Sequence, residues 1–276
     1  MNYILSHPYC TPSAILLRNA ILKIKPESRI LVTHRPERIR SKDTVLLRYG
    51  NSSEIVGRDF SMCDLDFIQI MSNKLILSKK LIDAGINTVQ FFRGVPEENN
   101  FPLLIRTTLT SCAGKGIHLA KSLEEFNELN GSAYYWTPFI KFNSEFRVHI
   151  CGDHIIKLFK KIWESEESEP EFPIRHNDNY SFKLASYENL PKLNEFISKI
   201  LQVDGIGTDR FFAMDVGWDN ENKKWLSIEG NSAPGLNNDT AMEYAKKILS
   251  ILEEKHDEIF WTGSPQRRIK YNADGS

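Results

Sequence analysis

The sequence RFFAMDVGWDNENKKWLSIEGNSAPGL, residues 210–236, contains two apolar stretches on either side of a polar turn. We expect strands over residues 209–217 and 224–229, because both are rich in apolar and aromatic residues. The residues between them, Asp-Asn-Glu-Asn at 219–222, favour a tight turn. The sequence therefore predicts an antiparallel hairpin followed by a Pro-Gly turn.

Three oxygen-bearing side chains lie near the ends of these predicted strands. Asp215 closes the first strand, and Glu229 and Asn231 close the second. Glu229 and Asn231 are two residues apart, so they project to one face, and strand pairing can bring Asp215 to the same face. Two carboxylates and an amide oxygen suit a hard ion such as Mg²⁺. An exposed acidic hairpin explains these three residues alone equally well.

A second feature lies upstream, where residues 101–107 form a predicted buried strand that presents the cation Arg106. The loop that follows, TTLTSCAGKG at 107–116, contains small and hydroxyl residues and ends in Lys115 and Gly116. Such a loop can donate backbone N–H groups to a triphosphate while the two cations offset its charge. A plain hairpin connection is the commoner meaning of a loop with two glycines.

Residues 144–162 alternate apolar and polar side chains and predict two antiparallel strands. Glu145 and Arg147 share one face of the first strand. The alternative to a binding role is a solvated face with cross-strand ion pairs. Further donors are Lys157, Lys160 and Lys161 on the second strand, and Arg175 and Asn177 in a polar segment that an ordinary turn also explains.

The composition limits the class of protein. Of the 276 residues, 41% are hydrophobic and 26% are charged, which is typical of a soluble globular protein. The net charge of −1 does not indicate nucleic acid or an anionic membrane as a partner. No apolar run reaches the roughly 20 residues that span a bilayer, and the first residues do not form a secretory signal. The four scattered cysteines contain no CxxC pair, so we expect a cytoplasmic protein with no zinc or disulfide framework.

Periodicity elsewhere predicts mixed α and β structure with antiparallel hairpins, which favours α+β lobes over one doubly wound sheet. The acidic segment 164–171 contains a proline and is expected to be a mobile loop. Predicted helices begin near residue 11 and cover 73–86, 188–202 and 240–260, and further short strands cover 30–33, 44–48 and 117–120.

In their order along the chain these segments resemble the ATP-grasp superfamily. NKLILSKKLIDAGINT is similar to its entry helix and FPLLIRTTLTSCAGKGI to its phosphate loop. FIKFNSEFRVHI resembles its hinge and following strand, and AMDVGWD with WLSIEGNSAPGL resembles its metal hairpin. The ending E-x-N-S-x-P-G is most similar to the carboxylate–amine ligase branch that contains the ribosomal-protein glutamate ligases.

The resemblance implies a role for each matching residue. Lys74 and Arg106 take the places of phosphate-contacting cations, and Lys115 and Gly116 belong to the loop over the phosphates. The remaining roles are adenine binding at the hinge for Phe139 and Ile140, a ribose or metal contact for Glu145, the acyl-phosphate and amine for Arg147, the γ-phosphate and substrate for Lys160, Arg175 and Asn177, and Mg²⁺ or Mn²⁺ binding for Asp215, Glu229 and Asn231.

The same resemblance implies an ATP-grasp fold of two α+β subdomains that clasp ATP, after a small α/β N-terminal lobe. The implied divisions are residues 1–72 for the lobe, 73–138 and 139–262 for the subdomains, and 263–276 for a mobile tail. The loop 108–116 and the segment 164–172 are the expected lids.

The implied activity is an ATP-dependent ligase that joins a small-molecule or peptide carboxylate to an amine through an acyl-phosphate. An ATP-grasp phosphotransferase and a non-catalytic nucleotide-binding module are the alternatives. The sequence does not define the two substrates or the oligomeric state.

Two residues depart from the family pattern. Arg106 stands where lysine is usual, which keeps the charge but changes its geometry. Pro138 occupies a hinge position where an acidic or amide side chain often reads the adenine amino group. Proline also has no N–H there, which puts the nucleotide preference in doubt.

Overall fold

The structure is a computed structural model that describes residues 2–39, 45–55, 61–107, 116–129, 135–172, 179–186, 190 and 192–255. The chain forms two compact units. Unit 1 contains residues Met1–Ile68, Asp209–Phe211 and Ser232–Ser276, and unit 2 contains Gln69–Thr208 and Phe212–Asn231. The domain limits implied by the family resemblance remain predictions.

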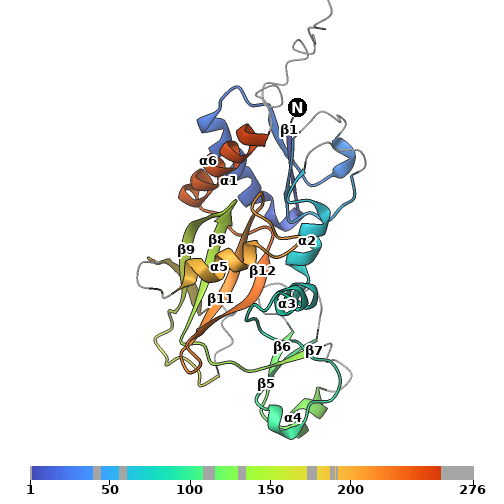
Figure 1. The fold of residues 1–276 in the computed structure, drawn as a ribbon, viewed down its shortest axis with the longest axis vertical. Coiled ribbons are helices and arrows are strands. Elements are labelled where there is room, and N and C mark those ends of the chain that lie inside the picture. The colour runs from blue at the N-terminus through green and yellow to red at the C-terminus, as the bar shows by residue number, and fades with distance from the viewer. Residues whose placement is uncertain are drawn as a thin grey trace, which may run out of the picture. The chain divides into compact units, whose positions relative to one another are not determined.

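Unit 1 is built on a four-stranded sheet with the order β2-β1-β3-β4 and parallel pairing throughout. Helix α1 buries Ala14, Leu17 and Ile21 at helical spacing, and α6 lies beside it (Figure 1). The elements are β1 (Asn2–Ser6), α1 (Thr11–Ile24), β2 (Ile30–Thr33), β3 (Leu46–Tyr49), β4 (Ser61–Met62) and α6 (Asn238–Lys255), with short 3₁₀ helices at Pro8–Cys10 and Pro36–Arg38.

The sequence after β12 is attached to this sheet by one tight contact and one hydrogen bond. Gly50 has φ +70°, and a Cβ at that position would lie 2.6 Å from the Cβ of Ala233. The hydroxyl of the fully buried Tyr49 donates to the carbonyl of Pro234. Ala233 and Pro234, at the start of the predicted Pro-Gly turn, therefore pack against the sheet of unit 1, whereas Gly235 is exposed.

Unit 2 contains a five-stranded antiparallel sheet, ordered β10-β9-β8-β11-β12, and a three-stranded sheet, ordered β6-β5-β7. Helix α3 is capped by the side chain of Asn73, which accepts from the N–H groups of Leu75 and Ile76, and packs against β12. The elements are α3 (Lys74–Asp83), a 3₁₀ helix (Glu98–Asn100), β5 (Leu103–Arg106), β6 (Ile117–Ala120), α4 (Leu123–Glu128), β7 (Tyr135–Pro138), β8 (Ser144–Cys151), β9 (His154–Trp163), β10 (Tyr180–Leu184), α5 (Leu193–Leu201), β11 (Phe211–Asp219) and β12 (Lys224–Asn231); α2 (Leu65–Ser72) crosses the division between the units.

Both predicted hairpins are confirmed, as β8–β9 and β11–β12. The helix predicted over 188–202 begins only at Leu193, because Lys192 adopts φ +57° and cannot continue a right-handed helix. Strands β1 and β10 were not predicted. Within the described ranges no helix is long and apolar enough to cross a membrane.

Candidate functional site

The two acidic residues of the predicted metal hairpin are direct partners across β11 and β12. Asp215 pairs with Glu229, and Ala213 pairs with Asn231, so the three oxygen-bearing side chains share one face. A β-bulge between Asp215 and Val216 shifts the register of the strand pairing on the side toward the hairpin turn. Asp215 is 1% exposed, and its carboxylate therefore needs compensation from nearby cations.

Arg147 provides the first part of that compensation from the neighbouring strand β8. Its Nε donates to Oδ1 of Asp215 at 2.7 Å, and its Nη2 donates to Oδ2 at 2.9 Å. This two-point contact fixes the guanidinium plane. The Cζ of Arg147 lies over the ring of Phe182 on β10, 4.4 Å from the ring centroid, so the guanidinium also makes a cation–π contact.

Lys161 on β9 adds a second cation to the same cluster. Its Nζ lies 3.3 Å from Oδ2 of Asp215 and 3.2 Å from Oε2 of Glu145. Burial alone would lower the pKa of this ammonium, but the carboxylates of Asp215, Glu145 and Glu229 raise it further than burial lowers it. Lys161 is therefore charged at neutral pH, although it is 6% exposed.

The structure does not bring Lys160, the predicted site residue, to this cluster. Lys160 pairs with Phe146, so it projects to the face of the sheet opposite Lys161 and Arg147. Sequence reasoning noted both lysines, but two adjacent lysines on a strand give no indication of which one faces the site.

Two more predicted cations lie on other elements of unit 2. Lys74, the first residue of α3, forms an ion pair with Glu229. Arg106 pairs with Tyr135 across β5 and β7, and it is 7% exposed. Burial raises the pKa of the Tyr135 hydroxyl, Arg106 lowers it and Glu229 raises it, so both charges act at this tyrosine. Within the described ranges, the Nε of Arg106 has no hydrogen-bond partner.

The predicted phosphate loop is described only at its two ends, Thr107 and Gly116. Gly116 has φ +72°, and its carbonyl accepts the N–H of Thr107 at 2.9 Å. The remaining predictions there and in the polar segment, for Lys115, Arg175 and Asn177, lie outside the described residues.

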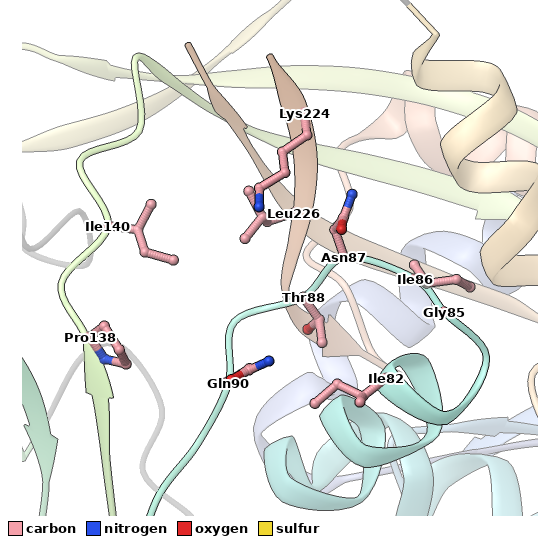
Figure 2. A pocket seen from close by; sticks show the side chains of 10 residues that line it. All are labelled: Ile82, Gly85, Ile86, Asn87, Thr88, Gln90, Pro138, Ile140, Lys224 and Leu226. Atoms are coloured by element: carbon pink, nitrogen blue, oxygen red, sulfur yellow. The ribbon is translucent and has the colours of Figure 1, made fainter. Parts of the chain in front are cut away.

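The predicted hinge borders a cavity of about 430 Å³ in unit 2 (Figure 2). Pro138 and Ile140 line it, whereas the ring of Phe139 packs edge-on against Phe172 at 5.2 Å. A cavity of this size is within the usual range for small-molecule sites. Its other lining residues, which sequence reasoning did not include, are Ile82, Gly85, Ile86, Asn87, Thr88, Gln90, Lys224 and Leu226.

The donor set on the β11–β12 hairpin fits a hard divalent cation in its chemistry, because all three side chains offer oxygen. Within the described ranges no three His, Cys, Asp or Glu side chains gather as a ligand cluster, so the amide oxygen of Asn231 is needed to complete the set. The carboxylate oxygens of Asp215 and Glu229 also contact Arg147, Lys161 and Lys74. A metal ion would share these oxygens with cations that are already present.

Comparison with known proteins gives a match in structure. No protein-family model and no curated protein sequence matches the chain. A RimK domain ATP-grasp protein from Sphaerobacter thermophilus is 14% identical with a TM-score of 0.59, covering 90% of this chain and 100% of its own. D-alanine–D-alanine ligase from Bacillus anthracis, complexed with ATP, is 14% identical with a TM-score of 0.63, covering 92% and 98%.

A third similar structure was solved with a precursor, Mg and ADP bound. The ATP-grasp ligase PsnB, complexed with a phosphomimetic variant of its minimal precursor, Mg and ADP, is 8% identical with a TM-score of 0.65, covering 90% of this chain and 97% of its own. Together these likenesses confirm the fold that the sequence motifs predicted, which is the ATP-grasp fold.

Proposed function

We propose that this chain, which has the ATP-grasp fold, is an ATP-dependent ligase that joins a carboxylate to an amine. The observation that carries the proposal is the charge arrangement on one face of unit 2. Ion pairs there join three cations to three carboxylates: Lys74 to Glu229, Arg147 to Asp215, and Lys161 to Asp215 and Glu145. Six charges gathered at partly or fully buried positions are costly for stability, and such arrangements are typical of functional sites.

The proposed reaction needs these cations because two anions must meet. An oxygen of the substrate carboxylate bonds to the γ-phosphorus of ATP while the bond from that phosphorus to the β–γ bridging oxygen breaks and ADP leaves. The amine nitrogen then attacks the acyl carbon, the bond from that carbon to the phosphate oxygen breaks, and the amine loses a proton to solvent. Cations fixed in position stabilise the spread negative charge of the phosphoryl group without reorganising.

The residues of the site divide this task. Arg106 has a buried donor with no partner in the described ranges, which suits a phosphate oxygen, and Lys74 can exchange Glu229 for a phosphate. Arg147 is held in plane by Asp215 and is suited to orient a carboxylate or acyl-phosphate. Mg²⁺ held by Glu229, Asn231 and Asp215 would supply further neutralisation of the phosphates, and PsnB was crystallised with Mg and ADP.

The substrates belong to the class of amino acids or peptides. D-alanine–D-alanine ligase acts within that class by its name.

Turnover tests the proposal directly. The protein is incubated with ATP, Mg²⁺ and a pool of amino acids and short peptides, and ADP and phosphate release are followed. Release of both products that depends on the pool supports a ligase. A stable phosphorylated product without phosphate release would instead indicate a phosphotransferase.

A matched pair of variants tests the site. We expect Glu229→Gln to lower turnover at least 100-fold, because it removes a proposed Mg²⁺ ligand and the ion-pair partner of Lys74. Glu221→Gln, in the exposed turn of the same hairpin, serves as the control. Equal rates for the two variants would refute the assignment.

A further inference from the structure

The hinge of this chain offers few backbone groups to a nucleotide base. Pro138 has no N–H, and its carbonyl accepts from the hydroxyl of Thr137 at 3.1 Å. The N–H of Phe139 donates to the carbonyl of Pro102 at 2.9 Å. The positions Pro138 and Phe139 therefore offer no free N–H to a base, and side chains that line the hinge cavity can contribute to base recognition.

Polar side chains face the same cavity from the opposite wall. Figure 2 shows Lys224 extending along β12 past Leu226 with its ammonium turned to the open space, and Gln90 entering from the segment after α3. Within the described ranges, neither Lys224 nor the carboxamide of Gln90 has a hydrogen-bond or ion-pair partner.

The acid opposite Lys224 on β11 does not hold the lysine in place. Asp219 pairs with Lys224 across the hairpin, but its carboxylate oxygens accept the N–H groups of Glu221 and Asn222 and the side-chain amide of Asn222. Burial raises the pKa of Asp219, and the hydrogen bonds from Asn222 and Glu221 lower it by more than the ammonium of Lys224 does. Lys224 is therefore available to a ligand in the cavity.

We infer that Lys224 reads the base and that the site accepts nucleotides with a 6-oxo purine, GTP and ITP, at least as readily as ATP. An ammonium has three donors and no acceptor. It can donate to a purine carbonyl, whereas the amino group of adenine offers it no acceptor at that position. Gln90 can turn either end of its carboxamide to the base and so does not restore a preference for adenine. The inference rests on the proposed function, because it assigns the hinge cavity to the base.

The test measures nucleotide binding and needs no knowledge of the other substrates. Dissociation constants for Mg-ATP, Mg-GTP and Mg-ITP are measured by calorimetry for the full chain and for Lys224→Met and Lys224→Arg. ITP separates the 6-oxo group from the 2-amino group of guanine. Lys246→Met, which removes an exposed lysine paired with Glu243 on α6, controls for the loss of one surface charge.

We expect GTP and ITP to bind the unaltered protein at least as tightly as ATP. Lys224→Met should lower the affinity for GTP and ITP, relative to that for ATP, by about tenfold or more. Lys224→Arg and Lys246→Met should leave this ratio of affinities unchanged. Strong preference for ATP, with a ratio that Lys224→Met does not change, overturns the inference and leaves the proposed function standing. Failure of all three nucleotides to bind overturns both.

Discussion

Replacing Lys161 by methionine removes one of two cations from a buried cluster of four charges. Arg147 and Lys161 balance Asp215 and Glu145, and the variant leaves two carboxylates against one guanidinium. Loss of one partner of a buried ion pair costs about 3–5 kcal/mol. Because Arg147 still holds Asp215 at two points, we expect the lower end of that range, about 3 kcal/mol.

Lys160→Met is the matched control, because the neighbouring residue projects to the opposite face and forms no ion pair with a described residue. We expect it to change the free energy of unfolding by no more than about 0.5 kcal/mol. Urea unfolding at pH 7, followed by fluorescence of the five tryptophans, measures both variants. With a slope of about 3 kcal/mol per molar urea, Lys161→Met should lower the midpoint by about 1 M.

Nucleotide binding by the two variants provides a second measurement. We expect Lys161→Met to weaken Mg-ATP binding while Lys160→Met leaves it unchanged. If the midpoints of the two variants fall by equal amounts, the assignment of Lys161 rather than Lys160 to the charged cluster is wrong.

Three further predictions concern pH, packing and phosphate binding. The pKa of His149 is lowered to about 4, first by burial and then by Arg147, so its unfolded form binds a proton that the folded form excludes. The resulting contribution to the free energy of unfolding is complete above pH 6.5 and is lost as pH falls toward 4, by about 3 kcal/mol. His149→Gln should remove this part of the pH dependence. Plots of the free energy of unfolding against pH that run parallel for the variant and the unaltered protein would contradict the prediction. Gly217→Ala would place a Cβ 2.3 Å from the ring of Phe142 and should cost about 1–3 kcal/mol in thermal unfolding, whereas Gly235→Ala meets no atom within 4 Å and should be neutral. Arg106→Met should weaken Mg-ATP binding about tenfold or more by calorimetry while changing stability by less than about 1 kcal/mol, because the Nε of Arg106 has no partner to lose in the described ranges; equal affinity would exclude Arg106 from the phosphate site.

The sequence allowed prediction of local structure where apolar stretches or an apolar–polar alternation border a polar turn. The β11–β12 hairpin follows from two apolar stretches around a polar turn, and its register brings Asp215 to the face that Glu229 and Asn231 share, as expected. The alternation along β8 and β9 likewise predicted their pairing. Strand β10 was not predicted, because YSFKL is short and follows a long polar stretch that contains prolines.

Other features depend on contacts between distant segments. Sheet order places β8 between β9 and β11, and only that order brings Arg147 and Lys161 together at Asp215. The sequence did not show which residues of β9 project to this face, because a bulge after His149 shifts the register of the pairing with β8. The polar wall of the hinge cavity, with Gln90 and Lys224, joins segments more than a hundred residues apart in sequence.

The place of α6 in unit 1 has a consequence for how the protein is made. The sheet strands of that unit end at Met62, yet α6, which lies beside α1, begins at Asn238. At the usual speed of translation, roughly ten seconds or more separate the emergence of these two parts from the ribosome. During that interval the apolar faces of β1–β4 and α1 lack their last helix. The nascent chain therefore exposes an incomplete core for longer than most small domains do, and it should be a client of chaperones that bind apolar segments.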